Sequence, residues 1–111
     1  MIIIVGMGVN MLFEKLEQEI DMLQRNLVVL SVVAKNGPIG ITKIAEETDM
    51  PLHKVRYSLR VLELEQLIRP STHGAVVTDL AHDFFKTFDM RVDEIAQKIS
   101  TLKILYAPDE K

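Results

Sequence analysis

The segment PLHKVRYSLRVLE, residues 51–63, places hydrogen-bond donors beside apolar residues at helical spacing. Val55, Leu59 and Leu62 recur at helical intervals, so a helix here would bury one side. The rest of the segment provides imidazole, ammonium, guanidinium and phenol groups, all of which can donate hydrogen bonds to an anion. The segment therefore predicts an exposed helical surface that can bind a polyanion. The residues outside the apolar side are Leu52, His53, Lys54, Arg56, Tyr57 and Arg60.

Positive charge is concentrated around this segment. The 111-residue chain has a net charge of −3, but residues 51–78 carry +2 and the remainder carries −5. Overall acidity argues against binding a polyanion, so the placement of the cations decides the interpretation. The alternative is that these cations are ordinary charged residues on an exposed helix face. Four cations are few for binding a partner of high charge density.

Other chemistry finds little support in the sequence. The chain has no cysteine, which excludes disulfides, thiolate catalysis and cysteine-ligated metals and fits a reducing compartment. His53, His73 and His82 do not share the spacing of a metal site. The sequence shows no Ser-His-Asp context, no phosphate-binding loop and no paired carboxylates in a predicted cleft, so it gives no sign of catalysis. We expect a cytoplasmic protein that is not an enzyme and binds no cofactor or metal.

The first residues, MIIIVGMGVN, are apolar but match no targeting segment. The run before Glu14 is too short for a transmembrane helix and lacks the basic start and cleavage site of a secretory signal. Gly6 and Gly8 match part of a dinucleotide-binding fingerprint, but a third glycine and a following βαβ unit are missing. We interpret residues 1–10 as an apolar N-terminal extension, either an edge strand or an extension ahead of a start at Met11, and expect no membrane partner.

Helical periodicity begins after this extension. Asn10 can cap a helix over residues 11–36, whose apolar residues recur every three or four positions. Gly37 in the left-handed conformation, followed by Pro38, would end this helix. A very short strand over residues 39–41 is predicted next, because its isoleucines are bounded by turn residues.

Two shorter helices and a hairpin follow. Thr42 can cap a helix of about two turns in which Ile44 and Ala45 face inward, and Pro51 opens the next helix. The sequences LIRP and AVVT flank STHG, which is typical of a β-hairpin. Thr78 can cap a final helix over residues 79–105. The elements together predict a mainly α protein with a small β-sheet (α+β).

The stretch from residue 39 to residue 78 resembles the winged helix-turn-helix domain of small prokaryotic, archaeal-type transcriptional regulators. The family pattern has a small residue in the first short helix and an apolar residue in the turn, matched here by Ala45 and Met50. It continues into a run before the wing, matched by QLI from Gln66. Gln66 and Asp49 depart from the pattern, because glycine is usual or frequent at their positions, although aspartate tolerates the left-handed conformation better than most residues.

The resemblance implies a single winged-helix domain over residues 11–105, with long N- and C-terminal helices flanking the helix-turn-helix and wing at 39–78. It also implies double-stranded DNA as the partner, with residues 52–65 in the major groove and the wing, 69–77, on the backbone or minor groove. Arg56 would read a guanine edge, while Lys54 and Arg60 would neutralise phosphates. The implied contacts are Thr42, Lys43, Leu52, His53, Lys54, Arg56, Tyr57, Arg60, Arg69, Ser71, Thr72 and His73.

The long terminal helices predict a homodimer. A domain of this size can bury one side of each helix but struggles to cover the rest of its aliphatic surface. The alternative is ordinary packing within one chain. A small-molecule effector between these helices and the winged domain is a further expectation, and a protein-interaction or assembly module without direct DNA binding is the alternative function. The expected dimer residues are Leu16, Ile20, Leu23, Val92, Ile95, Ile99 and Leu102.

Overall fold

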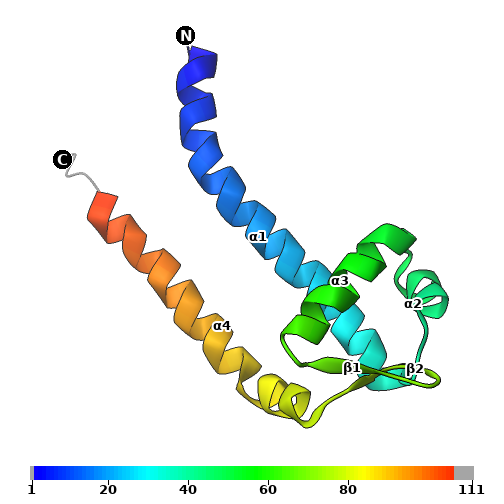
Figure 1. The fold of residues 1–111 in the computed structure, drawn as a ribbon. Helices are drawn as coiled ribbons and strands as arrows, with labels where there is room; N and C mark the ends of the chain where they lie inside the picture. Colours follow the sequence, from blue (N-terminus) through cyan, green and yellow to red (C-terminus); the bar gives the residue numbers. More distant parts are fainter. Residues whose placement is uncertain (1, 107–111) are drawn as a thin grey trace.

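The computed structural model describes the backbone of residues 2–106 and the side chains of residues 11–105. This part of the chain is mainly helical with a small antiparallel sheet, as predicted (Figure 1). Within it, none of the helices has the length and the apolar run needed to cross a lipid bilayer. The elements in chain order are α1 (Ile2–Asn36), α2 (Ile41–Thr48), α3 (Leu52–Leu64), β1 (Ile68–Ser71), β2 (Gly74–Val77) and α4 (Asp79–Tyr106).

The N-terminal helix starts earlier than the sequence predicted. α1 already begins at Ile2, so Asn10 lies inside the helix and does not cap it, and of the two interpretations of residues 1–10 the edge strand is wrong. The segment contains no proline, so the helical hydrogen bonds propagate through it from the following turns despite Gly6 and Gly8.

α1 ends at Asn36, close to the predicted position, but for a different reason. Gly37 does not adopt the left-handed conformation that we expected. Its N–H donates a hydrogen bond of 2.8 Å to the carbonyl of Val33. A Cβ atom at Gly37 would lie 2.6 Å from that same oxygen and 3.0 Å from the carbonyl oxygen of Ala75. Glycine is therefore required by the close approach of two backbone segments.

The predicted strand over residues 39–41 is reduced to one bridge. Ile39 exchanges two backbone hydrogen bonds with Ala75, its N–H donating at 3.2 Å and its carbonyl accepting at 2.8 Å. The chain then turns at Gly40, which is the N-cap of α2, and Ile41 is already helical. The prediction that Thr42 caps this helix is wrong, because the helix begins before it and has no side-chain cap.

The turn between α2 and α3 follows the sequence closely. Asp49 takes the left-handed conformation, with φ 57° and ψ 34°, at the position where the family pattern often has glycine. Met50 packs against the core, and Pro51 in extended geometry is the N-cap of α3. α3 buries Val55 and Leu62, as its apolar spacing predicted.

The predicted hairpin is present as β1 and β2, and its last paired residues are Ser71 and Gly74. Gln66, between α3 and β1, takes a φ of 63°, so a non-glycine residue adopts the left-handed geometry there. The prediction that Thr78 caps the last helix is confirmed, because its Oγ1 accepts a hydrogen bond of 3.3 Å from the N–H of Ala81.

The core occupies one end of the molecule. It is formed where the end of α1 meets α2, α3 and the hairpin, a region we call the lobe (Figure 1). From α4 only the start, at Ala81 and Phe84, packs against it. The radius of gyration of 18.3 Å exceeds the roughly 13 Å of a compact domain of this length. The described core residues are Val29, Leu30, Val33, Ile39, Ile44, Val55, Leu62, Leu67, Ile68 and Ala81.

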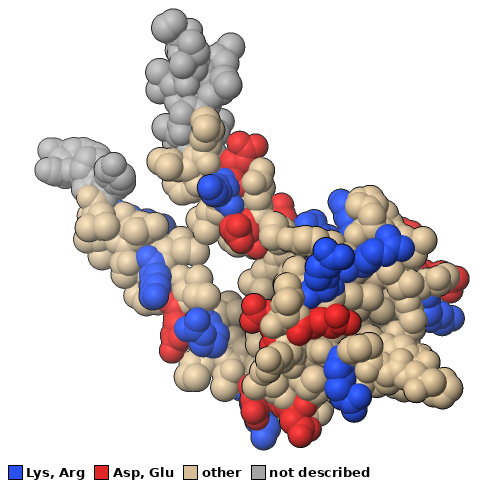
Figure 2. All heavy atoms as spheres, in the orientation of Figure 1, with Lys and Arg blue, Asp and Glu red and all other residues tan. Residues whose placement is uncertain are grey.

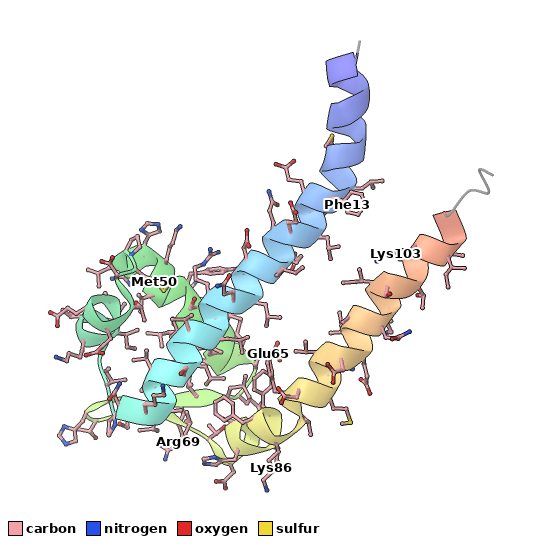
Figure 3. All side chains as sticks on the ribbon, turned by 180° about the vertical axis from the view of Figure 1, so that it is seen from behind. Phe13, Met50, Glu65, Arg69, Lys86 and Lys103 are labelled. Atoms are coloured by element: carbon pink, nitrogen blue, oxygen red, sulfur yellow. The ribbon has the colours of Figure 1, made fainter. Side chains whose placement is uncertain are left out.

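Two arms extend from the lobe. We define the arms as residues 11–28 of α1 and residues 85–105 of α4. They project from the lobe in the same direction, with the start of α1 and the end of α4 at their free ends (Figures 1 and 3). The arms account for the elongated shape of the molecule, which measures 62 × 32 × 21 Å.

Candidate nucleic-acid interface

The exposed side of α3 carries the predicted donor-rich surface. Val55, Ser58 and Leu62 are buried along the opposite side and fix the orientation of the helix. Leu59 and Val61 are half-buried beside that side, and the other positions of α3 face solvent. The six predicted contacts on α3 are all exposed, namely Leu52, His53, Lys54, Arg56, Tyr57 and Arg60.

Within this surface, four residues form a stripe along one helix face. His53, Arg56, Tyr57 and Arg60 follow the spacing of three and four residues that brings side chains onto the same face. Lys54 lies at its flank. On the face shown in Figure 2, lysine and arginine atoms gather over α3. The stripe combines charge-assisted donors with the aromatic face of a tyrosine, which suits an anionic partner.

The cations of α3 form no ion pair with the part of the chain that the structure describes. Among the described residues, the ion pairs join Lys43 to Glu46 and Arg91 to Glu94, outside α3. Lys54, Arg56 and Arg60 therefore have no carboxylate of the described part within ion-pair distance. Their charge is available to a partner.

α2 contributes less than the sequence suggested. Thr42 and Lys43 are exposed near its start, as predicted. The Lys43 ammonium, however, lies 3.8 Å from a carboxylate oxygen of Glu46, and both side chains are mostly exposed. Such a surface pair is weak and can be replaced by a stronger anion.

The hairpin presents its predicted residues to solvent, but one of them is already engaged. Arg69, Thr72 and His73 are exposed. The hydroxyl of Ser71 donates a hydrogen bond of 2.6 Å to the carbonyl of Gly74 and so closes the turn. Because the hydroxyl proton of Ser71 is used in this hydrogen bond, Ser71 is not available in this structure to donate a hydrogen bond to an anion.

Sequence reasoning missed two features of α3. Ser58 is fully buried, and its hydroxyl finds no hydrogen-bond partner among the described residues. The burial of Ser58 could have been inferred from its position three residues after the buried Val55. It was missed because serine is not counted among the apolar residues that define the periodicity. Leu64 is 76% exposed near the end of α3. It adds a second leucine to a predicted surface whose apolar members were Leu52 and the ring of Tyr57.

The histidines stay apart, on α3, in the hairpin turn and on α4. Within the described residues, histidines and carboxylates do not gather in groups of three that could hold a metal ion. His53 and His73 therefore belong to the polar surface of the lobe.

The predicted dimer residues lie on the arms and are largely exposed. Each of the seven exposes between 38% and 51% of its surface, and Leu23 also lines the cavity described next. They are Leu16, Ile20, Leu23, Val92, Ile95, Ile99 and Leu102. Packing within one chain, the alternative interpretation, does not cover them in this structure.

A cavity of about 520 Å³ lies where the arms leave the lobe, between α1, α3 and α4. Leu27, Val61 and Phe84 contribute to its apolar walls, and Glu65 and Asp83 also line it. Figure 3 shows Glu65 at the end of α3, on the side toward α4. The cavity is at the place where an effector was expected.

Comparisons with known proteins support the fold of the chain but do not assign it to a family. No protein-family model matches the chain. An uncharacterised protein of Methanocaldococcus jannaschii is 33% identical over 60 residues, which are 54% of this chain and 15% of that protein. The chain therefore spans only a small part of that relative.

Two solved structures are similar over more of the chain. The activation domain of the phage T4 transcription factor MotA superposes with a TM-score of 0.53 and 22% identity, covering 67% of this chain and 80% of that one. A protein of unknown function from Listeria innocua superposes with a TM-score of 0.52 and 17% identity, covering 100% of this chain and 87% of that one. About two thirds of the chain thus shares its fold with a domain of a transcription factor.

Proposed function

We propose that this protein is a winged helix-turn-helix regulator of transcription that binds double-stranded DNA as a homodimer. In this proposal α2 and α3 are the helix-turn-helix, α3 is the recognition helix and the β1–β2 hairpin is the wing. The proposal depends on the exposed stripe of α3, because its arginines and the flanking Lys54 have no carboxylate partner among the described residues. The resemblance of residues 39–78 and the similarity to a transcription-factor domain support the same function.

The chemistry of α3 suits the major groove. An α-helix fits this groove, and a guanidinium can bind the O6 and N7 atoms of guanine together. Arg56, in the middle of the stripe, is our candidate for this contact. Lys54 and Arg60 flank it and suit phosphates, which fix the register of a protein on the duplex.

The modest charge of one lobe makes a dimer necessary. Lys54, Arg56, Arg60 and Arg69 are the cations of the proposed interface, and one lobe alone offers few phosphate contacts. Two lobes double these contacts and read half-sites about 34 Å apart. The cavity between α1, α3 and α4 is where we place the proposed effector, since α3 forms part of its wall.

The test is selection of duplexes from a random pool, followed by affinity measurements against salt concentration. We expect a steep loss of affinity with rising salt. Arg56→Ala should weaken binding to the selected duplex more than to a random one. Lys86→Ala removes the same charge from α4 and serves as the matched control. Absence of binding to any duplex at low salt would exclude the proposal.

A protein-interaction module without direct DNA binding is the second candidate. The observation that favours it is the apolar surface on α3, where Leu52, Tyr57 and Leu64 are 45%, 50% and 76% exposed. The matched phage structure is described as an activation domain. If this candidate is correct, Leu64→Ser should abolish capture of a protein partner while Arg56→Ala leaves it intact, and no duplex should be bound.

A further inference from the structure

The two arms carry apolar stripes of the same helical spacing. On α1, Leu16, Ile20 and Leu23 continue at helical spacing toward Leu27, where the cavity begins. On α4, the stripe continues from Phe84. This alternation of three and four residues is the seam by which helices pack into bundles. The remaining stripe residues of α4 are Phe88, Val92, Ile95, Ile99 and Leu102.

The stripes do not cover each other within one chain. Open space separates the two arms in Figure 2, and the stripe residues of the outer arms are largely exposed. A second copy of the chain fits this surface, because it brings one helix of each kind. Two chains related by a two-fold axis would close a bundle of four arms.

Charge distinguishes the possible pairings of the arms. The outer part of α1, residues 11–21, carries Glu14, Glu17, Glu19 and Asp21 against the single Lys15. From Ile95 to Leu105, the charged residues of α4 are Lys98 and Lys103. Figure 3 shows Lys103 near the free end of α4. Pairing α1 with α1, or α4 with α4, would bring like charges together, whereas pairing α1 with α4 brings opposite charges together.

We propose that the α1 arm of each chain packs along the α4 arm of a second copy, with the free ends of all four arms on the same side. This inference rests on the proposed homodimer and specifies its interface. Leu27 and Phe84 both line the cavity, so they mark the same level of the two arms. Leu16 lies eleven residues from Leu27 toward the free end of α1, and Ile95 lies eleven residues from Phe84 toward the free end of α4. These two residues should therefore meet across the interface.

The orientation follows from the same charges and agrees with the proposed binding to DNA. With the acidic end of one α1 beside the basic end of the other α4, both lobes lie at the same end of the bundle. The reverse orientation would place the lobes at opposite ends of arms that give the molecule its 62 Å length. That separation is far above the roughly 34 Å between half-sites on one face of a duplex.

The absence of native cysteine makes the pairing directly testable. A Leu16→Cys chain is refolded together with a tagged Ile95→Cys chain and mildly oxidised. We expect a disulfide between the two different chains, while each variant alone remains largely uncross-linked. Efficient cross-linking of Ile95→Cys alone, or a dimer by mass that gives no mixed disulfide, would overturn the inference. A protein that is monomeric at every concentration would overturn it as well.

A second pair of variants leaves the apolar stripes intact. Glu14→Lys with Glu17→Lys should weaken dimerisation about tenfold, since both α1–α4 contacts then join like charges. Adding Lys98→Glu and Lys103→Glu to the same chain should restore it. If like arms paired instead, the first change would not weaken dimerisation, because it lowers the repulsion between two α1 arms and leaves two α4 arms unaltered. Duplex binding by the unmodified chain is measured separately. The experiments can therefore exclude the proposed interface without excluding DNA binding, or exclude DNA binding without excluding the interface.

Discussion

The hydroxyl of Thr78 donates a hydrogen bond of 2.6 Å to the main-chain carbonyl of Gln66. These residues stand at the end of α3 and the start of α4, on either side of the hairpin. The N–H of Thr78 also donates to the carbonyl of Leu67 at 3.0 Å. One residue therefore joins the chain after the proposed recognition helix to the start of α4, which it also caps.

Thr78→Ala should lower the free energy of unfolding by about 1–2 kcal/mol, because it removes a helix cap together with the bond to Gln66. Urea denaturation followed by circular dichroism measures the change. Thr78→Ser keeps the hydroxyl and is the matched control, with a much smaller loss expected. Equal losses for the two variants would show that the hydroxyl is not responsible.

Gln66→Gly should stabilise the protein, by roughly 0.5 kcal/mol. A left-handed residue with a Cβ costs about 1–2 kcal/mol, and the greater freedom of glycine in the unfolded chain offsets part of the gain. Glu65→Gly is the control, because Glu65 has a φ of −82° and glycine there brings only the entropic cost. The argument fails if both glycines destabilise the protein equally in the same denaturation experiment.

Gly74→Ala should be severely destabilising, by more than about 3 kcal/mol. Gly74 has a φ of +128°, and an added Cβ would lie 2.5 Å from the carbonyl carbon and oxygen of Ile39. The change would strain the turn and break the bridge between Ile39 and Ala75. Gly40→Ala is the control, since its Cβ would meet nothing within 4 Å. The two thermal midpoints should differ clearly, and similar midpoints would contradict the geometry.

Ser58→Ala should raise the free energy of unfolding by about 1 kcal/mol. The buried hydroxyl has no partner in the described part of the chain, and leaving such a group unpaired is costly. Ser100→Ala, on the exposed part of α4, should change stability little. A loss of stability in Ser58→Ala would indicate that the hydroxyl bonds a group or water in solution.

Ile95→Glu should convert the proposed dimer to a monomer, because a carboxylate would be placed inside the seam between the arms. Sedimentation equilibrium measures the mass, and duplex affinity should fall with it. Ser100→Glu places the same charge elsewhere on the same arm as the control. Retention of the wild-type mass by Ile95→Glu would exclude this arm from the interface.

Local patterns predicted the elements that depend on nearby residues. The spacing of Val55, Leu59 and Leu62 indicated the buried side of α3, and the left-handed Asp49 followed from its place in the turn. The same periodicity placed the polar contacts of α3 on its exposed side. In each case the interacting residues are close in sequence, so the pattern contains the necessary information.

Errors arose where the backbone is determined by distant residues. Ile39 pairs with Ala75, and Gly37 is constrained by the carbonyls of Val33 and Ala75. A reading of neighbouring residues saw a strand and a left-handed cap at these places, because it has no access to the partner across the fold. The engagement of Ser71 in its own turn was missed for a different reason, since a hydroxyl in a loop can equally face a partner or the backbone.

The exposed arms have a consequence for how the protein responds to dilution. In the proposed dimer the apolar stripes are covered only by the second molecule, which links the stability of the folded state to the protein concentration. The midpoint of thermal melting should therefore fall as the sample is diluted. In a cell, a dimer of this kind would lose stability when the chain is scarce, and its proposed binding to a duplex would weaken at the same time.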